Sequence, residues 1–89
     1  MSRPVTLSPR GERDLRRIPE KQRLAIVEGL RALADEHPSA DIKALTGHRG
    51  WYRLRVGDWR VLYLSDPPGV VVERIANRRD LERALATLP

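Results

Sequence analysis

The sequence predicts an α+β fold, in which an N-terminal strand and a helical hairpin pack on a small antiparallel β-sheet. In the first half of the chain, apolar residues recur at helical spacing, whereas between residues 51 and 76 the hydrophobic period becomes two. Turn-forming residues separate the segments of the second half. We therefore expect the order strand, helix, helix, strand, strand, strand, helix, within a single domain over residues 1–89.

The N-terminal segment predicts a short strand at Val5–Leu7, followed at once by a helix. Ser8 and Pro9 are the residue types preferred at a helix N-cap and at the first helical position. We expect this helix to run through Ile18, because Pro19 cannot continue it. Its apolar content is low, which is typical of a helix at the protein surface.

A second helix is expected from Glu20 to His37, antiparallel to the first. It ends there because a residue that precedes proline, here Pro38, avoids the helical region of backbone angles. Apolar side chains at helical spacing predict one buried stripe along it, formed by Leu24, Ile26, Val27, Leu30, Leu33 and Ala34.

The second half of the chain predicts three strands and a short final helix. Residues 39–50 show no period and are interpreted as a loop. Strands are expected at Trp51–Val56 and Trp59–Ser65, joined by a two-residue turn at Gly57-Asp58. After a second turn, residues 70–76 form the third strand, and Leu81, Ala84, Leu85 and Leu88 indicate the helix.

The composition narrows the class of protein. Seventeen lysines and arginines oppose 12 acidic residues, for a net charge of +5, and only Lys21 and Lys43 are lysines. The absence of cysteine excludes disulfides, thiolate catalysis and sulfur-ligated zinc. Two histidines, His37 and His48, are too few for a metal cluster, so we expect no metal or cofactor. These features predict a small, basic, cytoplasmic protein.

The excess of arginine has two explanations. Its planar guanidinium grips phosphate bidentately and stacks on nucleobases. A genome rich in G·C would also raise arginine usage, so the positions of the arginines must decide between the two.

The turn at residues 57–58 fixes which hairpin residues face each other. One face, predicted to pack on the second helix, carries Tyr52, Leu54, Val56, Trp59, Val61 and Tyr63. On the other face Arg55 lies opposite Arg60, and Arg53 lies opposite Leu62. We expect these three arginines to project together from the side away from the helices.

Two like charges placed directly opposite each other destabilise a strand pair. An anion between Arg55 and Arg60 would relieve this repulsion, and the alternative is a solvated polar face. Between Arg49 and Arg60 the sequence holds four arginines and a single carboxylate, that of Asp58. The missing acidic neighbours favour the anion site.

Other residues near the hairpin are candidates for binding nucleic acid. Arg74 extends the basic surface if it shares the face of Val70 and Val72, and Arg78 would then stand at the rim. Trp51 lies two residues before Arg53 in the same predicted strand, so its side chain is expected on the same face. There it either stacks on a base or covers the edge of the sheet. Arg49 and Arg79 complete the set of nucleic-acid-binding candidates.

Three segments of the chain resemble the RelE/ParE toxin superfamily. They are Lys43–Gly47, the run WYRLRVGDWRVLY over Trp51–Tyr63, and the run IANRRD over Ile75–Asp80. The likeness extends from Val5 to about Glu82 and agrees with the predicted order of elements. It implies a toxin of a type II toxin–antitoxin system, with a cognate antitoxin as partner and operator DNA as a ligand of the two together.

The RelE branch implies a ribosome-dependent, metal-independent endoribonuclease that cuts mRNA and thereby inhibits translation. In such an enzyme a 2′-hydroxyl attacks the adjacent phosphate while basic residues stabilise the transition state. Carried over by position, the resemblance places these catalytic roles on Arg53, Arg55, Arg60 and Arg78.

The sequence also departs from the RelE pattern. RelE-like enzymes often have lysine at the positions of Arg53 and Arg55 and a tyrosine shortly after the last arginine, where this chain has Leu81-Glu82. An arginine is a poor general base, so His48 or Glu82 or the ribosome would have to transfer protons. Two alternatives stay open: a non-catalytic, ParE-like inhibitor of DNA gyrase, and a weak homologue that mainly represses its own operon.

Overall fold

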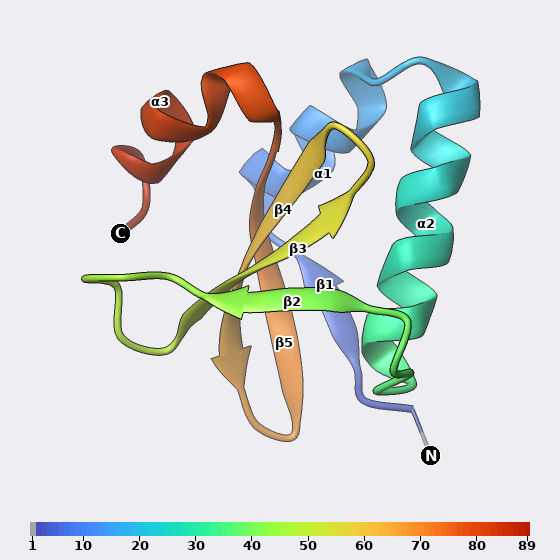
Figure 1. The fold of residues 1–89 in the computed structure, drawn as a ribbon, viewed down its shortest axis with the longest axis vertical. Helices are drawn as coiled ribbons and strands as arrows, with labels where there is room; N and C mark the ends of the chain where they lie inside the picture. Colours follow the sequence, from blue (N-terminus) through green and yellow to red (C-terminus); the bar gives the residue numbers. More distant parts are fainter. Residues whose placement is uncertain (1) are drawn as a thin grey trace.

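The computed structural model describes residues 2–89 and confirms the α+β fold, with a five-stranded sheet in the order β1-β5-β4-β3-β2 (Figure 1). Strand β1 runs parallel to β5, and the remaining neighbours are antiparallel. The elements are β1 Val5–Leu7, α1 Pro9–Arg17, α2 Glu20–Ala34, β2 Asp41–Ala44, β3 Trp51–Val56, β4 Trp59–Asp66, β5 Gly69–Asn77, a 3₁₀ turn η1 at Arg78–Asp80, and α3 Leu81–Leu85.

Helix α1 begins where the sequence predicts. The side chain of Ser8 accepts a hydrogen bond from the backbone N–H of Gly11 at 3.1 Å, and Pro9 is the first helical residue. The start of the helix packs directly on β5, because Gly11 lies against the carbonyl of Val72. A side chain at Gly11 would have no room there.

Helix α2 buries a narrower stripe than expected. Ile26, Leu30 and Leu33 are buried in the core, but Leu24 is 57% exposed. Leu24 precedes Ile26 by two residues, so it lies about 200° around the helix from the buried side. The helix also ends at Ala34 rather than at His37.

The hairpin of β3 and β4 has the predicted register and the predicted core face. Leu54, Val61 and Tyr63 are buried in the main hydrophobic cluster together with the buried side of α2. The rings of Tyr52 and Tyr63 stack with their centroids 5.6 Å apart. Burial raises the pKa of Tyr63, so its hydroxyl stays protonated in this core.

Strand β2 lies within residues 39–50, which the sequence predicts to be a loop. Its residues Asp41–Ala44 pair with β3, and all four are exposed. An edge strand without a buried face has no alternation of apolar and polar residues to reveal it. Its pairing with β3, and not its own burial, makes this segment a strand.

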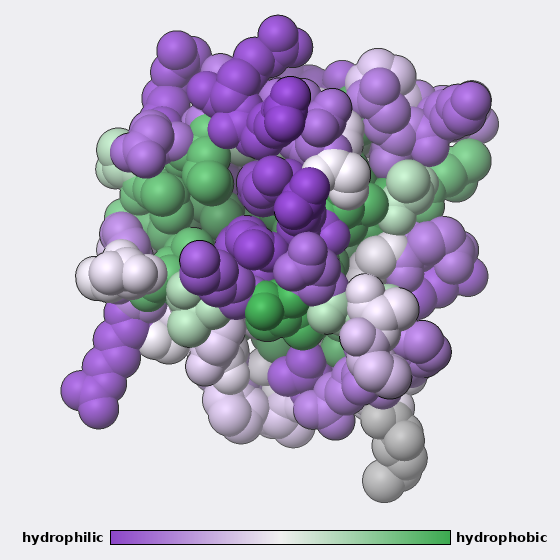
Figure 2. Space-filling model, viewed as in Figure 1, coloured by the Kyte–Doolittle hydropathy of each residue, from purple (hydrophilic) through white to green (hydrophobic). Residues whose placement is uncertain are grey.

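The second face of the sheet is covered in part by α3, so the expectation that the hairpin arginines face away from all helices is wrong. Leu62 and Ala76 from the sheet pack with Ala84 of α3 in a second small cluster, which Leu45 and the apolar residues around α3 extend. Seen from the side of β2, hydrophilic residues cover the middle of the surface between two hydrophobic areas (Figure 2).

None of the helices within residues 2–89 combines the length and the apolarity that crossing a membrane requires.

The packing of α1 on β5 predicts that Gly11→Ala destabilises the protein. An added methyl group would lie 2.5 Å from the carbonyl oxygen of Val72, and backbone on both sides would have to move. We expect the free energy of unfolding to fall by about 1–3 kcal/mol in urea denaturation. The neighbouring exposed change Arg13→Ala should alter it by less than about 0.5 kcal/mol. Equal stability of the two variants would contradict this packing.

Candidate functional site

Two rows of residues cross the sheet on the side of α3. The first row is Asp41, Arg55, Arg60 and Ala76, and the second is Lys43, Arg53, Leu62 and Arg74. The pairing of Arg55 with Arg60 is the one that the two-residue turn predicts. We use the term arginine face for Arg53, Arg55 and Arg60 together with Arg78, which follows the end of β5.

Arg60 is held at the centre of this face. Its Nη1 donates to the carbonyl oxygen of Gly57 at 2.9 Å and to that of Trp59 at 3.2 Å, so the guanidinium is tied to the hairpin turn. Burial lowers the pKa of Arg60, and the charge of Arg55 lowers it further. Arg53 and Arg78 act in the same direction. The site is therefore a concentration of positive charge that favours an anion.

Arg53 has an acidic partner that the sequence did not reveal. Its Nη1 lies 3.2 Å from a carboxylate oxygen of Asp41 and 3.1 Å from the carbonyl oxygen of the same residue. The expectation of a face without acidic neighbours is wrong at this point, because the unexpected strand β2 brings Asp41 alongside. The same strand brings the exposed Lys43, which lies opposite Arg53 and adds a further positive charge.

Arg55 is exposed, unlike Arg53 and Arg60. Among residues 2–89 it makes no ion pair, although Asp41 and Arg60 are its cross-strand neighbours. The only carboxylate close in register is thus engaged by Arg53. Arg55 is free to contact an incoming anion with its whole guanidinium.

Arg78 stands at the rim, as expected. Its backbone N–H donates to the carbonyl oxygen of Asp58 at 2.7 Å, and its Nε lies 3.6 Å from the carboxylate of the same residue. Both side chains of this pair are about two-thirds exposed, so the pair is weak and an anion can compete for Arg78. Asp58 and Asp41 are the carboxylates paired with arginines of this face.

The remaining hairpin candidates lie beside the arginine face. Trp51 is opposite Leu64 and is partly exposed, with the parity of Arg53. Arg49 is exposed in the loop between β2 and β3, and the partly buried His48 precedes it. In the part of the chain that the structure describes, Arg49 makes no ion pair.

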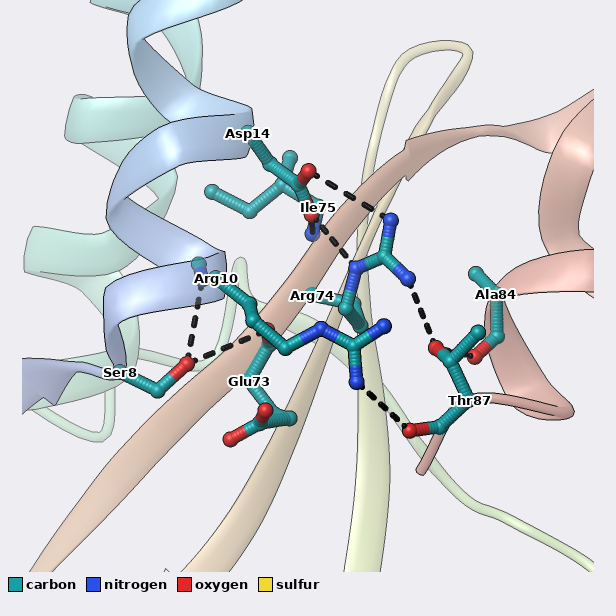
Figure 3. Close-up of polar contacts among 9 residues, drawn as sticks. Ser8, Arg10, Asp14, Glu73, Arg74, Ile75, Ala84 and Thr87 are labelled. Atoms are coloured by element: carbon teal, nitrogen blue, oxygen red, sulfur yellow. Dashed lines mark hydrogen bonds and ion pairs between the residues drawn. The ribbon is translucent and has the colours of Figure 1, made fainter. Parts of the chain in front are cut away.

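Arg74 lies on the same side of the sheet as the arginine face, in the row of Arg53, but it does not share the face of Val72. A β-bulge sets Tyr63 opposite Val72 and Leu62 opposite Arg74, so Arg74 and Val72 point to opposite faces although they are two residues apart. The guanidinium of Arg74 is, however, occupied by partners within the protein. Nε donates to Asp14 at 2.8 Å, and Nη1 donates to Oγ1 of Thr87 at 2.7 Å (Figure 3).

Asp14 and Arg74 join the two helical layers at the edge of the sheet. The carboxylate of Asp14, in α1, also accepts from the backbone N–H of Ile75 at 3.0 Å. Thr87, beyond α3, receives a second contact at its carbonyl oxygen, from Arg10 at 3.1 Å (Figure 3). We therefore assign Arg74 to structure and not to the binding of nucleic acid.

Within residues 2–89, no three histidine, cysteine or acidic side chains gather in a way that could hold a metal ion. The guanidinium groups of the arginine face can bind anions and stabilise negative charge.

The repulsion between Arg55 and Arg60 predicts that Arg55→Thr leaves the fold intact and stabilises it. Loss of one of two directly opposed positive charges should raise the free energy of unfolding by about 0.2–1 kcal/mol at low salt. The matched control Arg55→Lys keeps the charge and should show no gain. A gain that persists unchanged in about 1 M salt would contradict an electrostatic origin.

The contacts of Arg74 predict that Arg74→Ala destabilises the protein, because Asp14 would lose its partner in a site where both side chains are mostly buried. We expect a loss of about 1–3 kcal/mol in urea denaturation. The side chain of the basic residue Arg79 makes no hydrogen bond among the described residues, and its backbone N–H, which donates to Asn77, is kept in the variant, so Arg79→Ala should change stability by less than about 0.5 kcal/mol. The same loss in both variants would argue against the assignment of Arg74 to structure.

Similar structures come from toxin–antitoxin complexes. One is RelBE2 from Mycobacterium tuberculosis, with 28% identity, coverage of 88% of this chain and 100% of that chain, and a TM-score of 0.75. The RelB–RelE complex from Methanococcus jannaschii has 20% identity, coverage of 90% and 98%, and a TM-score of 0.76. The DinJ–YafQ complex from E. coli has 16% identity, coverage of 91% and 98%, and a TM-score of 0.73. The latter two support the fold alone.

The sequence itself matches a family model. No curated protein matches it, but residues 5–82 match the family described as the ParE toxin of the type II toxin–antitoxin system parDE. This match covers all the strands, α1 and α2, and the arginine face. The chain therefore belongs to the ParE toxin family, within the RelE/ParE superfamily of type II toxins.

Proposed function

We propose that this toxin is a ribosome-dependent mRNA endoribonuclease whose arginine face holds the phosphate at the cleaved bond. The observation that carries the proposal is the direct opposition of Arg55 and Arg60, with Arg53 and Arg78 close enough to lower the pKa of Arg60. Such an arrangement costs stability unless a phosphate is bound. The likeness to RelE-type toxins, at 28% identity for RelBE2, supports the same reading.

In the proposed reaction, the 2′-hydroxyl oxygen forms a bond to the adjacent phosphorus, and the bond from phosphorus to the 5′-oxygen of the next nucleotide breaks. The pentacoordinate intermediate carries more negative charge than the phosphodiester does. Arg60 is fixed by the hairpin turn and Arg53 by Asp41, so both guanidinium groups are preorganised for this charge. Arg55 and Arg78, which are more exposed, contact the RNA on either side.

Proton transfer is assigned to groups outside the arginine face. The 2′-hydroxyl must lose a proton, and the 5′-oxygen must gain one. Guanidinium groups stay charged and cannot serve as a base, and Asp41 and Asp58 are paired with Arg53 and Arg78. We place these two transfers on ribosomal groups or water, and on this assignment cleavage requires the ribosome.

A cognate antitoxin is the second proposed partner. The similar structures are complexes of a toxin with its antitoxin. We propose that an acidic segment of the antitoxin covers the arginine face, so that it neutralises the toxin by occupying the phosphate site. The complex would then bind operator DNA, and the free toxin would act in the cytoplasm.

Inhibition of DNA gyrase is the competing function, and two observations favour it. The matching family is described as ParE, and Leu81-Glu82 stands where RelE-like enzymes have a tyrosine. A non-catalytic inhibitor would need no group for proton transfer. A supercoiling assay with purified gyrase separates the two functions.

Arg60→Ala should abolish cleavage without unfolding the protein. The measurement is a map of mRNA 5′ ends in cell-free translation, with and without ribosomes. We expect codon-spaced cuts by the unmodified toxin only with ribosomes, and a loss of about 10²–10³-fold in rate for the variant. Arg31→Ala, an exposed change on α2 outside the site, should cut normally.

Two results would contradict the proposal. Full cleavage by Arg60→Ala would remove the arginine face from the mechanism. An intact message together with inhibited supercoiling would assign the protein to gyrase.

A further inference from the structure

A groove opens at the edge of the sheet, where β1 ends at Leu7 and β5 continues to Asn77. The end of α1 and the start of α2 form one wall, and η1 and α3 form the other. Asp14, Arg74 and Thr87 bridge the two helical layers here (Figure 3). The volume is about 600 Å³, within the range of about 300–1,000 Å³ that is typical of ligand sites.

The charges that line the groove are mainly positive. Arg17, Arg79 and Arg83 are exposed, and none of them forms an ion pair within residues 2–89. Arg74 also lines the groove, but its charge is balanced by the carboxylate of Asp14. Asp80 is the remaining carboxylate of the lining. Three unpaired guanidinium groups therefore face one acidic group, which favours an anionic ligand.

An aromatic side chain lies in the same groove. Trp59 is partly exposed, and it lines the groove while it also packs against the main core. An indole held on one side by a core offers a fixed surface on which a nucleobase can stack. Arginines beside an aromatic ring are the combination that single-stranded nucleic acids require. An acidic peptide would use the arginines but would have no need of the ring.

The groove is next to the arginine face. The turn η1 separates them, and of two consecutive residues in this turn one lies at the arginine face and the other in the groove. Arg78 pairs with Asp58 at the rim of the arginine face, whereas Arg79 lines the groove. A single strand of RNA that crosses η1 would contact both.

We propose that this groove binds nucleotides of the single-stranded RNA that flank the cleaved phosphate, with Arg17, Arg79 and Arg83 on the phosphates and Trp59 against a base. The inference rests on RNA being the substrate, but it concerns binding and not cleavage. The two can therefore fail separately.

The experiment uses the fluorescence of Trp59. The chain has two tryptophans, so Trp51→Phe leaves Trp59 as the only one. Titration with a six-nucleotide RNA at low salt should quench this fluorescence in a saturable way. In the unmodified protein, a shift of the Trp59 indole N–H signal in NMR spectra reports the same binding without any substitution. A fluorescent label on the RNA measures total binding in parallel.

Two double variants test the arginines. Arg17→Ala with Arg83→Ala should lower the RNA affinity that Trp59 fluorescence measures by about tenfold or more. It should also lower the steepness of log affinity against log salt by about 1 to 2. Arg16→Ala with Arg31→Ala removes the same charge from residues outside the groove, each in an exposed helical ion pair. This control should weaken binding by less than about threefold.

Several outcomes would overturn the inference. If the labelled RNA binds but the fluorescence of Trp59 does not change, the RNA lies elsewhere, on the arginine face. The proposed function would then still stand. Absence of RNA binding, or equal losses in both double variants, would also reject the groove. An acidic peptide that saturates the Trp59 signal where RNA does not would assign the groove to a protein partner. Conversely, groove binding together with an intact message on ribosomes would reject the nuclease alone.

Discussion

The register of the hairpin between β3 and β4 is the constraint on which the rest of the molecule depends. The two-residue turn at Gly57-Asp58 sets it, with Gly57 at a φ of +58° that favours glycine. Because side chains alternate along a strand, a slip of one residue would exchange the two faces. If β3 slipped in this way, Leu54 would leave the core and Arg55 would enter it. The same turn thus specifies the core and the candidate site.

The arginine face shows how a stable scaffold carries an unfavourable cluster of charge. On the opposite side of the same strands, Leu54, Val61 and Tyr63 are buried against α2. This burial offsets the repulsion among the arginines, and Asp41 and Asp58 relieve part of it. A phosphate bound to this surface would meet guanidinium groups that are already in position, since the turn holds Arg60 and β2 holds Arg53.

The ion pair of Asp14 and Arg74 connects this surface to the helical layers. It joins α1 to β5 beyond the point where β1 ends, and Thr87 extends the contact to the chain after α3. The Asp14 carboxylate also accepts a hydrogen bond from the backbone N–H of Ile75 in β5. Strand β1 ends before this point, so it cannot pair with that N–H. The position of η1, and with it those of Arg78 and Arg79 on its two sides, is therefore tied to α1.

The sequence by itself determined the fold class, the start of α1 and the register of β3 and β4, because capping residues, a two-residue turn and a period of two are local signals. It also determined that Arg53, Arg55 and Arg60 share a face. Only the tertiary structure decided the rest. Strand β2 has no buried face, so nothing local marks it or the charges of Asp41 and Lys43 that it contributes. The bulge opposite Leu62 and Tyr63 reverses the parity of Arg74, since it arises from how two strands pair and not from either strand alone.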